Sequence, residues 1–511
     1  MDQLGNLALG FSILLAPENL LAALIGVVLG SLVGVLPGLG PVGAMAVLLP
    51  VTFSLTPTSA IILLAGIYYG SMYGGSTTSI LLNVPGEATS VVTAIDGHQM
   101  TKQGRAGAAL AVAAVGSLLA GTLSTMGLML FAPALGSVAL NFGPPEYLAI
   151  AVFSLLVLSR LSGDPLPLAL MLAGIGLALA TVGQNVTTGV ARFTFGQIQL
   201  AKGIELAAVA VGLFGIAEVF SVAEERAGLP SVIPVKLREL LPTREEWKRS
   251  WAPMLRGSVL GFPFGLIPGP CAVISTFASY ELEKRVAPAD RRAQFGKGAI
   301  EGVAGPEAAN NAAAGGAMIP LLALGIPFAA PTAMLLGGFT IHNITPGPLM
   351  ISQHPEVFWA LIASMYLGNV MLLVLNLPLV GLFTSILRLP KDVLLVLILV
   401  ISVVGVYSVN NSLFDLGVMV AAGVVGYLLR KFRLNPTLLI LPLVIGAILE
   451  QSLLQTILLS RGQPSYLLER PIALVLLALA LVVVVLPAVL SAVRGTRAPS
   501  ALSAAGRAGQ F

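Results

Sequence analysis

Two clusters of uncharged polar residues stand out in an otherwise apolar chain, and their side chains are of the kind that binds small ions. The first lies within Tyr68–Ser90 and offers hydroxyl and amide groups beside glycines. The second lies within Glu301–Pro327 and adds a carboxylate. Such groups at the start of a broken helix suit a carboxylate ligand, and unwound carbonyls nearby suit Na⁺. The candidate binding residues in the clusters are Gly75, Ser76, Thr77, Thr78, Ser79, Asn83, Glu307, Asn310 and Asn311.

Four glutamates lie in apolar surroundings, where an ionisable side chain costs about 2.5–3.5 kcal/mol on insertion scales and so points to function. Glu307 is the best placed of them, since it shares its cluster with two asparagines. Glu87 and Glu146 follow Pro-Gly and Pro-Pro, which favours an interfacial loop, and Glu218 suits a structural or a functional role equally. For the Ser/Thr run, helix packing by small residues is the alternative interpretation.

Enzymatic motifs are missing from the sequence. There is no H-E-x-x-H, no Walker-type G-x4-G-K-[ST], and no G-x-S-x-G in a suitable context. The three histidines are scattered, and the single cysteine, Cys271, offers neither an internal disulfide nor a zinc spacing. We therefore expect no catalytic residues, no resident metal beyond Na⁺ at a transport site, and no enzymatic activity.

The composition identifies the elements that must position these residues as membrane helices. The chain has 511 residues, of which 56% are hydrophobic and 10% charged, and its mean hydropathy is +0.94. Soluble proteins carry about 25% charged residues. Several uncharged runs exceed the roughly 20 residues that cross a bilayer. We predict an all-α polytopic membrane protein with about 10–14 membrane segments, each about that length. The net charge of +4 fits an excess of Lys and Arg in cytoplasmic loops and not nucleic-acid binding.

A glycine stripe occurs twice. In GVVLGSLVGVLPGLGP, residues 26–41, glycine recurs every fourth residue, and the pattern returns 231 positions later in GSVLGFPFGLIPGP, residues 257–270. Each copy ends in Pro-Gly, a helix-breaking pair. This predicts an internal duplication whose helix breaks are hairpin tips, with kinked but continuous helices as the alternative. The candidate residues at or just after the tips are Pro37, Gly38, Gly40, Pro268, Gly269, Ser275 and Thr276.

The charge distribution predicts how the halves are oriented. Residues 222–256 hold seven Lys/Arg and five Glu, so we expect a cytoplasmic or interfacial linker. It separates a membrane repeat, 1–221, from a second repeat with extra helices, 257–493, and a cytoplasmic tail, 494–511, follows. Basic residues flank the second stripe on both sides but not the first. That asymmetry fits two inverted repeats, each with a re-entrant hairpin that enters from an opposite face.

Five long segments resemble the large membrane subunit of the tripartite tricarboxylate transporters. They are GVLPGLGPVGAMAVLLP, YYGSMYGGSTTSILLNVPGE, AIDGHQMTKQGRAG, PGPCAVISTFASYELEK and EGVAGPEAANNAAAGGAMIPLLALGIP, and the resemblance runs from about residue 20 to about residue 490. The tips, the Gly75–Ser79 run and Glu307 with Asn310 and Asn311 all fall within these motifs.

The resemblance implies a multi-pass secondary transporter of the bacterial inner membrane. It would import carboxylates such as citrate by symport with Na⁺ or H⁺, without another cofactor. A periplasmic solute-binding protein and a small four-helix membrane subunit would be its partners, and a homodimer is left open. The alternatives are an autonomous cation-coupled carboxylate carrier without a binding protein and, from another class, a polytopic membrane enzyme.

Overall fold

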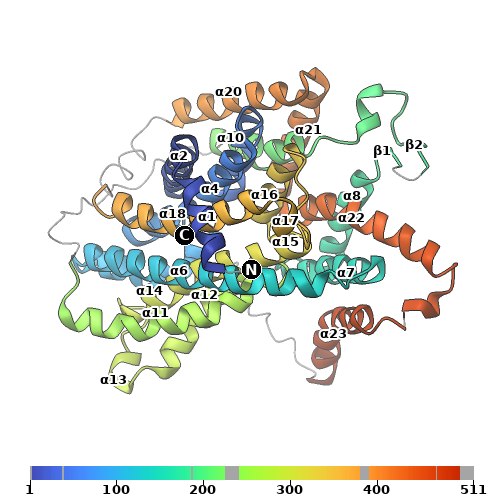
Figure 1. Cartoon of the computed structure of the whole chain (residues 1–511). Coiled ribbons are helices and arrows are strands. Elements are labelled where there is room, and N and C mark those ends of the chain that lie inside the picture. Colours follow the sequence, from blue (N-terminus) through green and yellow to red (C-terminus); the bar gives the residue numbers. More distant parts are fainter. Residues whose placement is uncertain are drawn as a thin grey trace.

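The protein is almost entirely helical (Figure 1). A computed structural model describes residues 3–36, 40–185, 188–224, 241–379, 391–467 and 469–494. Within these ranges, seven helices are long and apolar enough to cross a membrane, and six further apolar helices are shorter. Valines spaced every fourth residue along α20, Val396, Val400 and Val404, are exposed, as suits a lipid-facing surface. The predicted all-α polytopic fold is confirmed.

The elements follow one another along the chain with these bounds. Helices α1 to α6 are Gln3–Leu14, Pro17–Val35, Gly40–Leu48, Pro57–Leu82, Val91–Lys102 and Ala106–Ala139, with the 3-10 turns η1 (Pro50–Ser54) and η2 (Ala88–Ser90). Next come α7 to α10, which are Pro144–Leu161, Leu166–Ala180, Leu206–Ala210 and Ala217–Glu224. Between α8 and α9 lie strands β1 (Gly183–Gln184) and β2 (Ala191–Arg192) and the 3-10 turn η3 (Ile198–Lys202). The π-helical stretch η4 (Val211–Ile216) joins α9 to α10. Helices α11 to α18 are Arg244–Gly265, Cys271–Val286, Ala289–Arg292, Glu301–Gly316, Met318–Leu324, Ala330–Ile341, Met350–Gln353 and Pro355–Asn376. The last are α20 to α23, Lys391–Asn410, Leu413–Lys431, Thr437–Leu459 and Pro471–Arg494, with η7 at Pro464–Leu467.

The two glycine stripes pack helices against each other at very short range. A Cβ built on Gly26 or Gly30 of α2 would lie 2.6 Å from a carbonyl oxygen of α4. A Cβ on Gly261 of α11 would lie 2.7 Å from the Cα of Ala309 on α14. Only glycine, which has no side chain, permits two backbones to approach this closely. Small residues at helix interfaces allow membrane helices to associate in this way.

The stripes meet their partner helices in one register. Gly26 and Gly30 face Leu63 and Ile67 of α4, while the stripe glycines 231 positions later face Gly305 and Ala309 of α14. The partner residues are thus separated by 242 positions in both cases.

The same offset continues beyond the partner helices. Helix α4 is capped by Asn83 with φ 58°, and α15 is capped 242 positions later by Gly325 with φ 74°. Ser90 and Thr332, again 242 apart, each accept a hydrogen bond from the backbone N–H three residues earlier.

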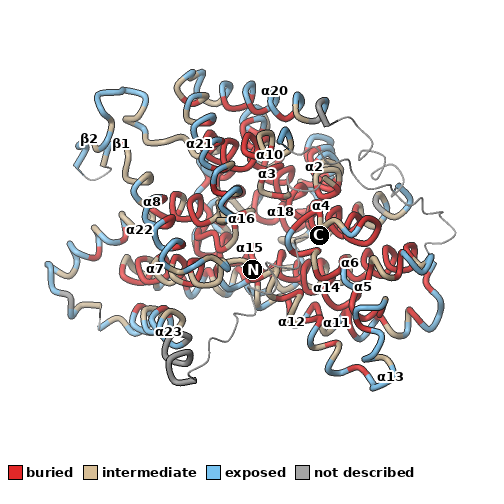
Figure 2. Tube along the Cα trace, turned by 180° about the vertical axis from the view of Figure 1, so that it is seen from behind, coloured by how far each residue is buried: buried red, intermediate tan, exposed pale blue. Residues whose placement is uncertain are grey.

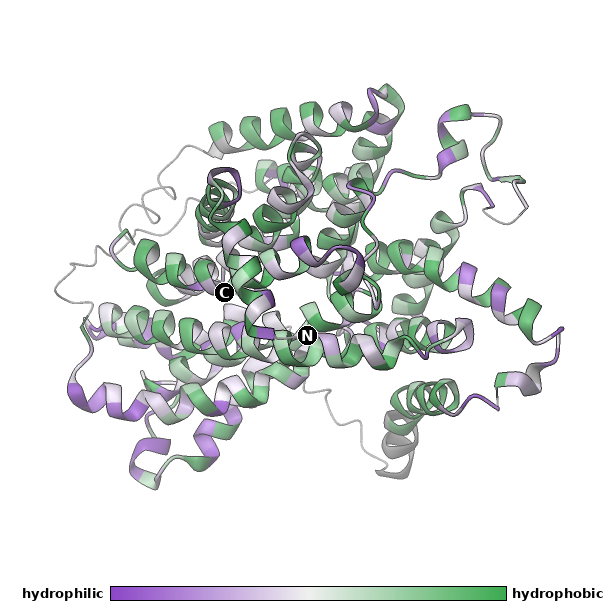
Figure 3. Cartoon of the chain, in the orientation of Figure 1, coloured by the Kyte–Doolittle hydropathy of each residue, from purple (hydrophilic) through white to green (hydrophobic). Residues whose placement is uncertain are grey.

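A tight turn follows the second stripe. Helix α11 ends at Gly265, α12 begins at Cys271, and the two helices pack against each other. In the turn Gly269 has φ +116°, and its N–H donates to the carbonyl of Phe328 at 2.9 Å. Hydrophilic residues gather around α13 and the start of α11 (Figure 3). After the first stripe, α2 ends at Val35 and α3 begins at Gly40, and Pro37 and Gly38 lie outside the described residues.

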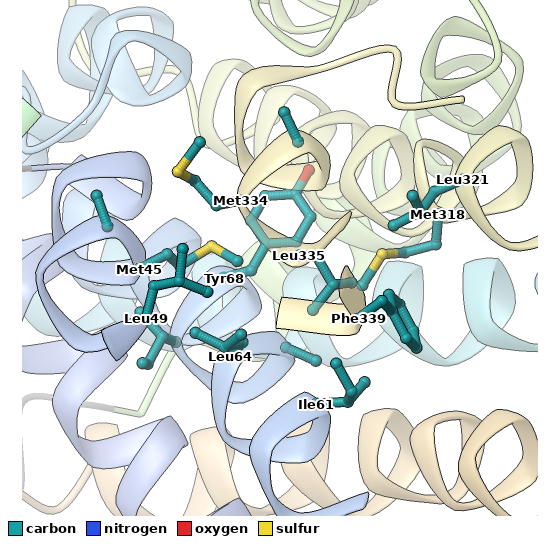
Figure 4. Close-up of a cluster of buried hydrophobic side chains, with 14 of the residues drawn as sticks. Met45, Leu49, Ile61, Leu64, Tyr68, Met318, Leu321, Met334, Leu335 and Phe339 are labelled. Carbon is teal, nitrogen blue, oxygen red and sulfur yellow. The ribbon is translucent and has the colours of Figure 1, made fainter. Parts of the chain in front are cut away.

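Helices α4 and α14 lie among the buried segments of the molecule (Figure 2). Every residue of α14 is buried, as is every residue of α4 from Ser59 to Leu82. One flank of α4 packs into an apolar cluster that includes Tyr68, Met318 and Leu335 (Figure 4). The two polar clusters of the sequence therefore lie on the most deeply buried helices.

Candidate functional site

Glu307, at the middle of α14, is completely buried and is held by hydroxyl groups from the other half of the chain. Ser76 Oγ on α4 donates to Glu307 Oε2 at 2.7 Å. Thr93 Oγ1 on α5 donates to Glu307 Oε1. The carboxylate thus ties α14 to α4 and α5, and residues more than 200 positions apart in sequence meet at one point.

Glu87 is the second buried carboxylate of this site. Its side chain accepts hydrogen bonds from Thr89 Oγ1 at 2.5 Å and from Asn310 Nδ2 at 3.3 Å. Gly75 makes room for it, because a Cβ there would lie 2.7 Å from Glu87 Cγ. Our sequence interpretation favoured an interfacial loop, whereas the structure buries Glu87 between α4 and α14, because the left-handed turn at Asn83 folds the chain back onto α4.

Two asparagines complete the site. Asn310 and Asn311 stand three and four residues after Glu307, so all three lie on adjoining faces of α14. Asn311 Nδ2 donates to Ser117 Oγ on α6 at 2.8 Å. Asn310 Oδ1 is buried without a hydrogen-bond partner among the described residues. A buried unpaired carbonyl oxygen is costly, and a cation beside Glu87 would satisfy it.

The site is acidic and tight. Within the described ranges, no Lys, Arg or His side chain forms an ion pair with Glu87 or Glu307. Thr77, Ser76 and Glu307 line a cavity of only about 10 Å³, and Asn311 lines another of about 20 Å³. Such volumes hold a single water or small ion. Two buried carboxylates without basic partners call for a proton or a metal cation, not for a multiply charged anion.

The other predicted residues have local partners. Thr78 and Ser79 hydrogen-bond to the carbonyl of Gly75, as hydroxyls do within helices, and Ser79 also donates to Ser90. Ser275 is buried and reaches the carbonyl of Ala309 at 3.3 Å, whereas Thr276 bonds within its own helix. Asn83 is exposed at the end of α4.

The structure describes the predicted tip residues only in part. Pro268 is buried in the turn after α11, and Gly269 packs on Phe328 and near Leu161 of α7 rather than on the carboxylates. Gly40, at the start of α3, has φ +56° and no atom within 4 Å of a built Cβ. The structure therefore unites the two polar clusters, while a binding role for the tips stays a prediction.

Sequence reasoning missed Thr93, Thr89 and Asp96. Thr89 and Thr93 are four residues apart, a helical spacing that would have indicated one common face. Asp96 is fully buried and accepts the N–H groups of Gly298 and Ala299 at 2.7 and 2.9 Å and the hydroxyl of Tyr280 at 2.8 Å. It fixes α5 to the segment that leads into α14.

Comparison with known proteins gives a family. Residues 20–441 match the tripartite tricarboxylate transporter TctA family. An uncharacterised 52.8 kDa protein from the TAR-I ttuC' 3' region of Agrobacterium vitis is 46% identical over 497 residues, which cover 97% of this chain and 98% of that protein. An uncharacterised protein from the TAR-II ttuC' 3' region of the same organism is 44% identical over 237 residues, 46% of this chain and 97% of that protein. No solved structure matches the chain.

Proposed function

The chain belongs to the tripartite tricarboxylate transporter TctA family, and we propose that it is the permease subunit that moves a carboxylate across the bacterial inner membrane with the gradient of a cation. A periplasmic binding protein would deliver the substrate, and a small membrane subunit would assemble with the permease. Family membership supports the transport of carboxylates, and the buried acidic site supports the cation.

The coupling cation, in this proposal, binds at Glu87 and Glu307. The observation that carries it is the burial of two carboxylates and the unpaired Asn310 Oδ1 with no basic side chain against them in the described part of the chain. Carboxylate and amide oxygens are ligands for hard cations, and each carboxylate is equally able to take a proton. Binding of Na⁺ or H⁺ would reduce the negative charge of the site and favour the conformation in which it is closed.

The substrate carboxylate, we propose, binds at the helix breaks of two inverted halves, and one helical bundle carries it across. The shared register of the stripes supports such halves, because α2 packs on α4 as α11 packs on α14. The turn at Pro268–Gly269, with basic residues at the far ends of both its helices, supports a hairpin that enters and leaves on one side.

The test is uptake of labelled tri-, di- and monocarboxylates into proteoliposomes. These contain the chain and its small subunit, with or without the binding protein, under an imposed Na⁺ or proton gradient. We expect uptake that needs the binding protein and one of the two gradients. Equal uptake without the binding protein would support an autonomous carrier instead, and conversion of a substrate without net movement would support an enzyme.

The cation site is tested with paired variants in the same vesicles. Glu307→Gln and Glu87→Gln should each abolish gradient-driven uptake, since an amide neither binds a proton nor carries the charge that holds Na⁺. Glu281→Gln is the control, because Glu281 is exposed on α12. Normal gradient-driven uptake by a folded Glu307→Gln protein would refute the cation site.

A further inference from the structure

A large cavity lies away from the acidic site, at the side of the molecule that carries the β1–β2 hairpin (Figure 1). Its volume is about 720 Å³, within the range of small-molecule sites. The end of α8, the hairpin, η3, the segment after α16 and one face of α22 form its walls. It extends to Gly325, the left-handed residue that follows α15.

An arginine and a glutamate stand together in the cavity wall. Arg192 on β2 forms a two-pronged ion pair with Glu450 on α22, with N–O distances of 2.7 and 3.0 Å. Asn185 Nδ2 also donates to Glu450, at 3.0 Å. Arg192 Nε, however, is buried without a hydrogen-bond partner in the described structure. Glu450 thus occupies only part of the donor set of a guanidinium whose fork suits a carboxylate.

Lys202, at the end of η3, adds a second positive charge to the same cavity. It is exposed, and within the described ranges it has no ion pair. Amide side chains of Gln184, Asn343, Gln451 and Gln455 also line the wall. Arg192 and Lys202 together carry one more positive charge than Glu450 balances, so the cavity favours an anion, in contrast to the acidic site on α14.

We propose that this cavity is a separate binding site for small di- and tricarboxylates, in which one substrate carboxylate displaces Glu450 from Arg192 and another pairs with Lys202. The proposal rests on the proposed function, since its ligands are the same carboxylates that the chain is proposed to bind at its helix breaks and transport. Displacement would draw the guanidinium toward the ligand and give Nε a partner. An ion pair that only joined the hairpin to α22 would leave Nε and Lys202 without a role.

Binding to the purified chain in nanodiscs tests the proposal by calorimetry, with citrate, succinate and acetate as probes. Arg192→Gln should raise the Kd for citrate about tenfold or more, as expected for loss of a charge-assisted pair. Lys202→Gln should weaken citrate and succinate severalfold but not acetate. Glu450→Gln should tighten citrate, because it removes the competing carboxylate. Arg470→Gln, which removes an arginine bonded to Tyr466 outside the cavity, is the control.

The direction of the Glu450→Gln effect separates a ligand site from a structural ion pair. A purely structural pair predicts that Glu450→Gln lowers the Tm and leaves or weakens citrate binding, and that result would overturn the proposal even if Arg192→Gln did not fold. Uptake by the wild-type protein in proteoliposomes distinguishes failure of this binding site from failure of the proposed transport function. Transport with unchanged Kd values in the variants would reject this site alone, whereas neither transport nor binding of any carboxylate would reject the proposed function as well.

Discussion

Replacing Gly261 by alanine should destabilise the protein, although alanine is the better helix former. Gly261 lies at the middle of the contact between α11 and α14. The added Cβ would lie 2.7 and 2.8 Å from Ala309 Cα and C, and closer still to its carbonyl oxygen, where ordinary contact begins at 3.4 Å. Because all three obstructing atoms belong to the backbone, the helices themselves must move apart.

The expected magnitude follows from two opposing terms. Alanine gains about 1 kcal/mol over glycine in a helix. Overpacking costs about 1–3 kcal/mol, and a backbone obstruction belongs at about 3. The net loss is then about 2 kcal/mol at Gly261, against a gain of about 1 kcal/mol at a helical glycine with open space. An unfolding entropy of about 2.1 cal/mol/K per residue gives about 1.1 kcal/mol/K for 511 residues, so the Tm values should differ by about 3 °C.

Thermal unfolding of purified Gly261→Ala and Gly417→Ala proteins in the same detergent measures this difference. Gly417 is the matched control, since it lies within α21 with no atom within 4 Å of a built Cβ. Alanines at both Gly257 and Gly261 should cost less than the sum of the two singles, because the first already separates the same pair of helices. Equal Tm values for Gly261→Ala and Gly417→Ala, or strict additivity along the stripe, would refute close backbone packing as the reason for the stripe.

Three further predictions concern the surroundings of the acidic site. Thr93→Val keeps the side-chain volume but removes a hydrogen-bond donor to Glu307. We expect the cation concentration for half-maximal uptake to change severalfold while the Tm stays within about 1 °C of the wild-type value. Titration of uptake against Na⁺ or pH measures the first effect. Asp96→Asn replaces a charged acceptor of two N–H groups and should cost about 1.5–3 kcal/mol, seen as a lower Tm, whereas Asp290→Asn on exposed α13 should leave it unchanged. Gly86→Ala places a Cβ 2.7 Å from Gly75 Cα and should abolish uptake without preventing membrane insertion; normal uptake would contradict the tight fold of this break.

The fold class and the close-packed stripes were predictable because both depend on local patterns. Long uncharged runs in the sequence indicate membrane helices. A glycine at every fourth position leaves one face of a helix without side chains. The choice of Glu307 and Asn310 as candidates, which stays a prediction, rests on a related local pattern. A charged or amide group inside an apolar helix is rare enough to indicate function wherever it packs.

The partners of these residues were not predictable. Ser76 meets Glu307 across 231 residues, and Arg192 meets Glu450 across 258. No periodicity in the sequence encodes such meetings, since they depend on how helices from different halves cross. Glu87 is an example. The Pro-Gly pair before it correctly indicates a loop, but the pair does not indicate the direction in which that loop folds.

The register of 242 positions also bears on why the described residues hold one acidic site of this kind and not two. Under the proposed repeat, the position of Glu307 corresponds to Ala65 on α4, and that of Asn310 corresponds to Tyr68. Tyr68 lies in the apolar cluster with Met318 and Leu335 (Figure 4), whereas the residue 242 positions later on α14, Asn310, donates a hydrogen bond to Glu87. Two such sites facing one another would bury four carboxylates within a few helices, and each would raise the cost of ionising the others. Under the proposed repeat, Ala65 and Tyr68 keep α4 free of a second carboxylate, and α4 instead contributes Ser76 and Gly75 to the one acidic site that the proposed cation coupling uses.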